Sequence, residues 1–192
     1  FIDGKTLGEA EFKVLLTELK ADLAAYLQTL PPGGVPHKTL ADIIAFNKAN
    51  ARVELQHFGQ ETFELAEKEK GLDDPEYLKA LTTSKQLAQA AGLDWIFRTK
   101  NVSIIVAQTN GPAWLTTLGK GDAFNPPSAS SLPAVAGYPH LTVPMGFDKG
   151  LPVGISFIGP KWHDHAVLKA GNAYELLAGL DMTPGFAVTA PQ

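Results

Sequence analysis

The serines are the candidate nucleophiles of this sequence. Acyl transfer needs a nucleophile, a base that deprotonates it and an oxyanion hole. The nearest approach to the nucleophile elbow G-x-S-x-G is Gly154-Ile155-Ser156-Phe157-Ile158-Gly159, which is one residue too long. Ser156 also falls in the middle of an expected strand, whereas the elbow requires a sharp strand-to-helix turn. The pattern therefore argues against Ser156 as a nucleophile.

Three further serines and a serine–lysine pair fit a catalytic role no better. Ser128, Ser130 and Ser131 lie in a loop-like segment with no lysine or histidine at a fixed short spacing, so solvation and local turns explain them. Ser84 and Lys85 are adjacent on an expected helix, where neighbouring side chains point in different directions. We predict that this chain contains no catalytic residue.

The histidines do not suggest a metal site. His163-Asp164-His165 offers two imidazoles, but no third and fourth ligand follows at a suitable spacing. Asp164 is better explained as the cap of a final helix, with both histidines exposed. His140 falls in an expected strand and is predicted to be packed or hydrogen-bonded. We expect no metal and no cofactor, because glycine-rich phosphate-binding and dinucleotide-binding motifs are also missing from the sequence.

Composition and charge exclude two classes of partner. The chain has 192 residues, of which 45% are apolar, and a net charge of −4 from 16 basic and 20 acidic residues. Basic and acidic residues are mixed along the chain and form no basic patch, so nucleic-acid binding is not expected. No apolar run approaches the roughly 20 residues of a membrane span. There is no cysteine, which excludes disulfides but leaves a cytoplasmic and a periplasmic location both open.

The first hundred residues are predicted to be helical. Apolar residues recur at steps of three and four from Gly8 to Leu30 and form one stripe, which we interpret as core or docking surface. Thr39 and Asp42 match a short version of a capping box that opens a second helix. Another short helix is expected over Thr62–Lys70.

A longer helix is expected to begin at Pro75, since proline suits the first position of a helix. It should end near Ala91, with Gly92 as a left-handed cap. Asp94 should then cap one more short helix, through Phe97.

Three apolar runs rich in β-branched residues predict strands, at residues 102–107, 140–145 and 153–158. The last run is apolar almost throughout, which favours a strand inside a sheet over an exposed edge. Residues 146–150 contain two glycines and predict a short connection. Residues 115–131 are predicted to form a long surface loop, and residues 165–177 a final helix.

The glycines and prolines around the last two strands resemble the C-terminal signature of the amidase signature family, most closely its peptide-amidase-like branch. The family pattern is roughly G-x-P-x-x-x-x-P-x-G, followed by G-L-P-V-G-x-x-x-x-G. It is matched here by Gly137, Pro139, Pro144, Gly146, Gly150, Leu151, Pro152, Val153, Gly154 and Gly159. Helical segments such as EFKVLLTELKADLAAYLQTL and TLADIIAFNKAN are similar to the matching part of peptide-amidase-like proteins, so the resemblance extends over most of the chain.

The resemblance implies an α/β fold, in which this chain is part of the amidase-signature fold: a mixed β-sheet, with about three strands here, covered by helices. It implies a single C-terminal portion over residues 1–192, helical over 1–100, strand-rich over 101–160 and with a C-terminal helix in 161–180. Family enzymes use a Ser–Ser–Lys triad, one serine of which is preceded by a cis peptide, and all three residues precede this segment. We therefore expect the chain alone to be inactive, and its start at Phe1 without methionine to reflect missing residues.

The resemblance also suggests substrate contacts. Loops at strand ends carry sites in α/β proteins, and the family places the loop Gln108–Trp114 near the substrate funnel. The candidate substrate-binding residues are Thr109, Gly111, Trp114, Phe124 and Tyr138. For the three aromatic residues, a role as loop anchors explains the sequence at least as well.

The match to the family is incomplete. Where the family commonly reads D-x-L-x-x-P-T, this chain has Ser103 and Gln108 but keeps Thr109, and Ala134 replaces a frequent asparagine. The segment Gly111–Trp114 nevertheless suits the peptide-amidase branch.

The expected partners are a small amide or peptide-amide substrate of the whole enzyme and the missing N-terminal part of the same protein. Uncovered strand surface would also favour self-association of the fragment. Two alternatives stay open: a fragment of an amidotransferase subunit, since such subunits share the signature, and a non-catalytic stand-alone interaction module.

Overall fold

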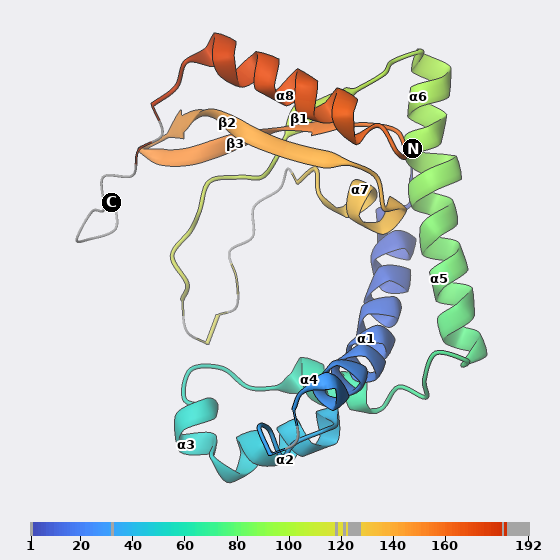
Figure 1. The fold of residues 1–192 in the computed structure, drawn as a ribbon, viewed down its shortest axis with the longest axis vertical. Coiled ribbons are helices and arrows are strands. Elements are labelled where there is room, and N and C mark those ends of the chain that lie inside the picture. The colour runs from blue at the N-terminus through green and yellow to red at the C-terminus, as the bar shows by residue number, and fades with distance from the viewer. Residues whose placement is uncertain are drawn as a thin grey trace. The chain divides into compact units, whose positions relative to one another are not determined.

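The computed structural model describes residues 2–31, 33–117, 119–120, 122, 128–181 and 183. The chain divides into two compact units, which we call unit 1 (residues 1–84 and 118–120) and unit 2 (residues 85–117 and 121–192). Unit 1 contains the first helices and unit 2 contains the sheet (Figure 1). Among the described residues, no helix is both long enough and apolar enough to cross a membrane.

Unit 1 consists of α1 (Gly4–Thr29), α2 (Leu40–Ala49), α3 (Ala51–Glu54), α4 (Glu61–Glu67) and most of α5 (Pro75–Ala88). The predicted capping box is confirmed. The Thr39 hydroxyl accepts a hydrogen bond from the N–H of Asp42 at 3.1 Å, and the Asp42 carboxylate accepts one from the N–H of Thr39 at 3.0 Å. Helix α1 begins earlier than expected because Asp3 caps it, accepting from two backbone N–H groups.

The core of unit 1 lies between α1, α2 and α4 and contains the buried residues Leu16, Leu40, Ile44 and Ala66. The predicted apolar stripe of α1 is only partly buried. Leu16 and Leu27 are buried, but Phe12, Leu15 and Tyr26 are 47%, 56% and 60% exposed. The described residues of unit 1 therefore cover only part of the stripe.

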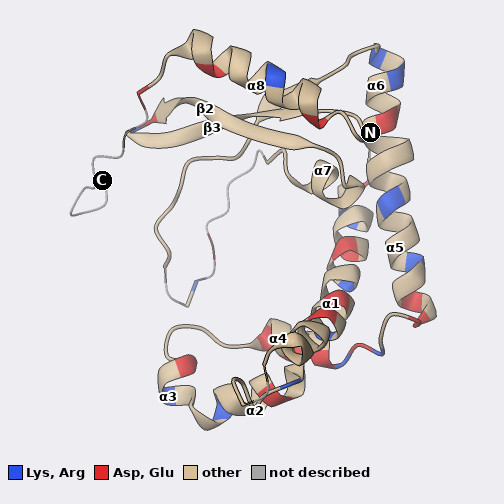
Figure 2. Cartoon of the chain, in the orientation of Figure 1, with Lys and Arg blue, Asp and Glu red and all other residues tan. Residues whose placement is uncertain are grey.

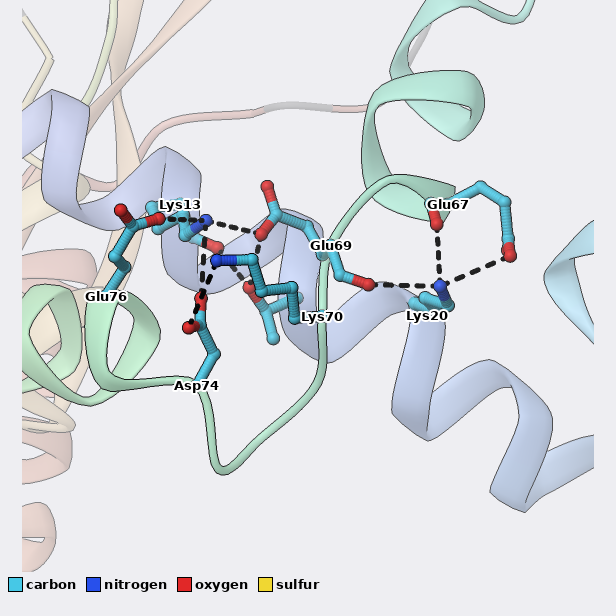
Figure 3. Close-up of polar contacts among 8 residues, drawn as sticks. Lys13, Lys20, Glu67, Glu69, Lys70, Asp74 and Glu76 are labelled. Atoms are coloured by element: carbon cyan, nitrogen blue, oxygen red, sulfur yellow. Dashed lines mark hydrogen bonds and ion pairs between the residues drawn. The ribbon is translucent and has the colours of Figure 1, made fainter.

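Lys13 of α1 ties the segment after α4 to this helix (Figure 3). Its ammonium donates a hydrogen bond to Glu69 Oε2 at 2.5 Å and lies 3.9 Å from Asp74 and 3.6 Å from Glu76. The side chains of Lys13, Glu69 and Asp74 are only 26%, 13% and 4% exposed. The hydrogen bond that Lys13 donates to Glu69 raises the pKa of Lys13, so the lysine stays charged and compensates the carboxylates around it.

Helix α5 runs directly into the π-helical turn η1 (Gln89–Leu93) and then into α6 (Asp94–Lys100). The prediction that Gly92 is a left-handed cap is wrong: Gly92 has φ −98° and ψ −106° and is buried within η1. Asp94 is the first residue of α6 rather than its cap. The left-handed cap is found instead at Asn101, with φ 51°, because asparagine tolerates this conformation better than most residues.

Three strands form the sheet of unit 2: β1 (Ile105–Gln108), β2 (His140–Asp148) and β3 (Leu151–Ile158). Their order is β1-β3-β2, and both pairings are antiparallel. The α/β class with three strands is confirmed, and β3 is the interior strand, as predicted. The connection between β2 and β3 is shorter than expected, because Lys149 (φ 49°) and Gly150 (φ 79°) close a two-residue turn that needs positive φ at both positions.

Two further helices complete the described part of unit 2. Helix α7 (Ser131–Ala136) starts at the last residue of the predicted 115–131 loop and is not expected from the sequence; it ends at Gly137, whose φ of 68° provides a left-handed cap. Helix α8 (Asp164–Ala178) confirms the predicted final helix, but Asp164 is not its cap. The cap residue is His163, whose side chain makes no capping hydrogen bond.

The sheet has one face covered by α8 (Figure 1). Val167 of α8 packs there against Val143 and Phe157. Gly171 allows the close approach, since a Cβ at that position would overlap the side chain of Leu141. Figure 2 shows that the strands are almost free of charge, and Asp148 at the hairpin tip is their one charged residue. The sheet of unit 2 is therefore built around neutral contacts.

Candidate functional site

Four hydrogen-bonded side chains lie on the sheet face opposite α8. They are His140 and Thr142 of β2, Ser156 of β3, and Thr109, which directly follows β1. The strand register brings them together: Thr142 is opposite Ser156, and Ser156 alternates with Phe157, which faces α8. We call these four residues the hydroxyl–imidazole cluster.

Gly154 makes room for this cluster. A Cβ at Gly154 would lie 2.6 Å from Thr142 Oγ1 and 2.9 Å from Thr109 Oγ1, closer than side chains tolerate. The missing Cβ lets the two threonine hydroxyls meet above β3. This glycine is therefore required for space rather than for an unusual backbone angle.

The hydrogen bonds of the cluster have a direction. His140 Nε2 lies 2.6 Å from Ser156 Oγ, Ser156 Oγ donates to Thr109 Oγ1 at 2.8 Å, and the two threonine oxygens are 2.6 Å apart. Because Ser156 has one hydroxyl hydrogen and gives it to Thr109, His140 must donate to Ser156 through Nε2–H. Burial lowers the pKa of His140, so the imidazole is neutral at pH 7.

This arrangement does not make Ser156 a nucleophile. Ser156 is completely buried, and its hydrogen points to Thr109 instead of to the imidazole that would have to remove it. It also lies within β3 and not at a strand-to-helix turn. The chemistry of the cluster is hydrogen bonding between neutral groups, which fixes geometry.

Thr109 is the residue of the cluster that connects it to a loop. Its N–H donates to the Gly154 carbonyl at 2.8 Å, and its carbonyl accepts from the N–H of Ala129 at 3.0 Å. The chain therefore leaves the sheet at Thr109, and Ala129 lies against the same residue. All three polar groups of Thr109 are engaged, which makes it an anchor of the chain at both points.

Asn110, the next residue, carries a polar atom of a different kind. Its Oδ1 is buried, yet it has no hydrogen-bond partner among the described residues. Its carbonyl accepts from the side chain of Gln108 at 3.0 Å, which holds the backbone in place. A buried acceptor without a donor is rare in proteins and costs free energy, so Asn110 is a functional candidate that the sequence pattern did not single out.

The structure brings together only some of the predicted substrate-binding residues. Thr109 belongs to the cluster, and Gly111 and Trp114 follow it in a stretch without helix or strand. Gly111 is half-buried and Trp114 is 39% exposed. Phe124 lies outside the described residues.

Tyr138 has a separate environment. Its hydroxyl donates to Asp94 Oδ1 of α6 at 2.6 Å, and burial followed by this hydrogen bond raises the pKa of Tyr138 to about 12. The residue directly follows the cap Gly137, so the bond links the end of α7 to α6. The hydroxyl is thus already used within unit 2, as expected of an anchor residue.

The sequence pattern singled out His140 and Ser156 separately but not as a pair. Their proximity depends on the β2–β3 register, which a bulge between Pro144 and Gly146 shifts by one residue. Aligning β2 with β3 on the basis of the predicted five-residue connection alone would therefore have paired the wrong residues. Thr142 offered no signal beyond its place in an alternating strand.

Unit 1 contains a cavity of about 370 Å³ between α1, α2 and α4, lined by Thr17, Lys20, Ala21, Ala24, Thr39, Leu40, Ala41, Glu67 and Gly71. Lys20 is its main polar group, and its ammonium donates to the carbonyls of Glu67 at 2.6 Å and Glu69 at 3.0 Å. The cavity thus offers mainly small apolar side chains. Within the described residues there is no group of three acidic or histidine side chains suited to a metal ion.

Comparison with known proteins places this geometry in context. A family model described as Amidase matches residues 102–168, which include all three strands and the start of α8. A probable amidase of Arabidopsis thaliana is 33% identical over 174 residues, which cover 90% of this chain and 30% of that protein.

Two solved structures are similar over nearly the whole chain. Native peptide amidase from Stenotrophomonas maltophilia matches with a TM-score of 0.86 and 38% identity, over 97% of this chain and 37% of that one. A peptide amidase in complex with the competitive inhibitor chymostatin matches with a TM-score of 0.88 and 39% identity, over 96% of this chain and 37% of that one. The chain thus spans about a third of the length of these relatives.

Proposed function

The chain belongs to the amidase signature family, and on this premise we propose that it is the C-terminal part of an enzyme that hydrolyses peptide C-terminal amides. The observation that carries the proposal is the identity of 38–39% with peptide amidase structures over at least 96% of this chain. One of those enzymes binds the competitive inhibitor chymostatin. The expected reaction adds water to a primary carboxamide and yields a carboxylate and ammonia.

In this proposal, one part of the enzyme carries the catalytic residues and this chain carries substrate contacts. A Ser–Ser–Lys triad, outside this chain, forms an acyl-enzyme, releases ammonia and is regenerated by water. The hydroxyl–imidazole cluster supports this division, because its serine is buried and has no base to receive its proton. The chain itself supplies the substrate-side segment that begins at Thr109 and includes Gly111 and Trp114. Phe124 and Tyr138 complete the proposed set.

Asn110 supports a substrate-side role for this segment. Its buried Oδ1 lacks a donor among the described residues, and a primary carboxamide or a peptide N–H would supply one. A site that pairs a buried acceptor with a substrate N–H rejects ligands lacking that group, because the acceptor is then left unpaired. Selection of an amide over the corresponding acid follows naturally from such a contact.

The proposal is tested first at the level of the gene. The reading frame upstream of Phe1 should encode a lysine followed by a Gly/Ser-rich signature, in frame with this chain. An upstream stop codon with no such signature would contradict the proposed division of the enzyme.

The second test measures activity. The 192-residue chain alone and the longer protein that includes the upstream residues are incubated with an N-acetylated dipeptide amide, and ammonia release is measured. We expect turnover only in the longer protein. Robust turnover by the chain alone would refute the absence of a triad. Ammonia release from glutamine instead of the peptide amide would favour the amidotransferase alternative.

A further inference from the structure

Thr109 holds the backbone at the start of the 110–117 segment, and the side chain of Thr109 is itself held by residues outside that segment. Thr109 uses its N–H, its carbonyl and its hydroxyl in hydrogen bonds at 2.6 to 3.0 Å. Its side-chain rotamer is set by Ser156 from one side and Thr142 from the other. Because Thr142 is exposed, water competes for its bond to Thr109, and the buried Ser156 is the firmer partner.

Ser156 in turn depends on His140. A serine hydroxyl can turn about its Cβ–Oγ bond, and a donor that occupies its oxygen helps to select the direction in which the hydroxyl donates. His140 provides such a donor through Nε2–H at 2.6 Å, from a position on β2 two residues before Thr142, which is the residue opposite Ser156. Among the described residues, no other side chain donates to the Ser156 hydroxyl, and Thr109 is the group that accepts from it.

We propose that His140 is a positioning residue, which orients the Ser156 hydroxyl onto Thr109 and thereby holds the beginning of the 110–117 segment in place. The importance of that segment for substrate rests on the proposed function above, whereas the hydrogen-bond chain itself does not. This hydrogen-bond relay, from His140 through Ser156 to Thr109, connects β2, β3 and the end of β1 through neutral groups only. His140 is at an unspecified position of the family pattern, directly after Pro139.

The test measures the local backbone directly, in the 192-residue chain. Amide hydrogen exchange is followed by NMR at Thr109 and Ala129, whose N–H groups donate to Gly154 and Thr109. Loss of one neutral hydrogen bond should raise exchange at these two amides about three- to tenfold. We expect this increase in His140→Phe, which keeps a ring but has no N–H donor.

The conservative variant separates positioning from general packing. His140→Gln places an amide N–H near the position of Nε2, and it should restore exchange at Thr109 and Ala129 to within about twofold of the original. His165→Phe makes the same change at an exposed site on α8 and should leave both amides unaltered. Unchanged exchange in His140→Phe, or a uniform increase across β3 and α8, overturns the proposal.

Two further measurements extend the test to a second variant and to enzyme activity. If His140→Phe does not fold, Thr109→Val removes only the hydroxyl at the other end of the relay, and Ala129 should then exchange faster while the β2–β3 amides do not. In the longer active protein, His140→Phe should raise KM for the peptide amide more than it lowers kcat, and His140→Gln should reverse the effect. Altered exchange with no amidase activity in any variant would contradict the proposed function but leave the relay intact.

Discussion

The helices of unit 1 are held by charged contacts, whereas the sheet of unit 2 is held by neutral ones. In unit 1, Lys13 of α1 is placed among three carboxylates, and Lys20 is bonded to two carbonyls at the end of α4 (Figure 3). In unit 2, the sheet relies on neutral hydroxyls and one neutral imidazole. The two units therefore differ in what would disrupt them: loss of a charge in the first, loss of packing or of a neutral donor in the second.

The difference follows from how deeply each polar group is buried. The lysines reach from a partly exposed helix, where the flexible side chain keeps contact with water. Ser156 is completely buried in a central strand, where an ionised partner would carry a large desolvation cost. A neutral donor is the less costly solution at that depth, and burial keeps His140 in that form by lowering its pKa.

The largest effect is expected from packing in unit 2. Phe157→Ala should lower the free energy of unfolding of unit 2 by about 3–4 kcal/mol, because it leaves a cavity beneath α8. Val106→Ala is the matched control, since Val106 is directly opposite on β1 but 53% exposed, and should cost less than about 1 kcal/mol. Urea unfolding combined with hydrogen exchange assigns the loss to a unit, and an equal loss in unit 1 would contradict the separation.

The next effect concerns the charged contacts of unit 1. Lys13→Met leaves Glu69 without its cation and leaves the buried Asp74 with Lys70 at 3.8 Å as its remaining partner. The variant should cost about 2–3 kcal/mol, near the lower limit for broken buried pairs because Lys13 is partly exposed. Lys5→Met removes the exposed pair with Glu9 and should cost less than about 0.5 kcal/mol. The same urea experiment, repeated in high salt, checks both variants. A loss that appears in unit 2 instead would show that the two kinds of contact are not separate.

The features that the sequence predicted correctly are local ones. The capping box of Thr39 and Asp42 involves residues three apart, and the nearly continuous apolar run of the last strand reflects its neighbours on both sides. Gly92 shows the limit of this reasoning. Glycine after a helical pattern usually ends the helix, but here a π-helical turn carries the chain through it into α6, and no local signal distinguishes the two outcomes.

The candidate site was only partly predictable for a related reason. Thr109 directly follows β1, in keeping with its prediction as a residue at a strand end, yet its partner Ser156 lies 47 residues away in the chain. Their contact depends on the pairing of β1 with β3 and on the bulge in β2, which are set by the whole sheet. The family signature indicated that Gly154 matters, whereas only the packing shows that it makes room for two hydroxyls.

A smaller effect is expected at the tyrosine that bonds to a carboxylate in unit 2. Tyr138→Phe removes the donor to Asp94 and should cost about 1–2 kcal/mol. Tyr174→Phe keeps the ring that packs against Phe157 and should change stability by less than about 0.5 kcal/mol. Because the pKa of Tyr138 is raised from 10.0 to about 12, its phenol should also titrate above the ordinary value in an absorbance titration, and this late component should be missing in Tyr138→Phe. A titration that is identical in the two proteins would argue against the bond.

The smallest effect should separate the units by pH. The pKa of His140 lies below its ordinary value of 6.5 because of burial, so the unfolded chain binds a proton first as the pH falls, and unit 2 loses stability from about pH 6.5 downward. In unit 1, hydrogen bonds from Lys38 and Lys48 lower the pKa values of Asp42 and Glu64. Their contribution is therefore lost only below the ordinary carboxyl values of 3.8 and 4.5.

Unfolding midpoints at pH 7.5, 6.5 and 5.5 (assay conditions chosen around the ordinary histidine value) therefore test the contrast between the units. His140→Gln cannot take up a proton, so the fall in stability of unit 2 between these values should disappear in this variant. His165→Gln makes the same change at an exposed position and should keep it. Parallel curves for the original chain and His140→Gln would show that the neutral imidazole does not distinguish unit 2 from unit 1.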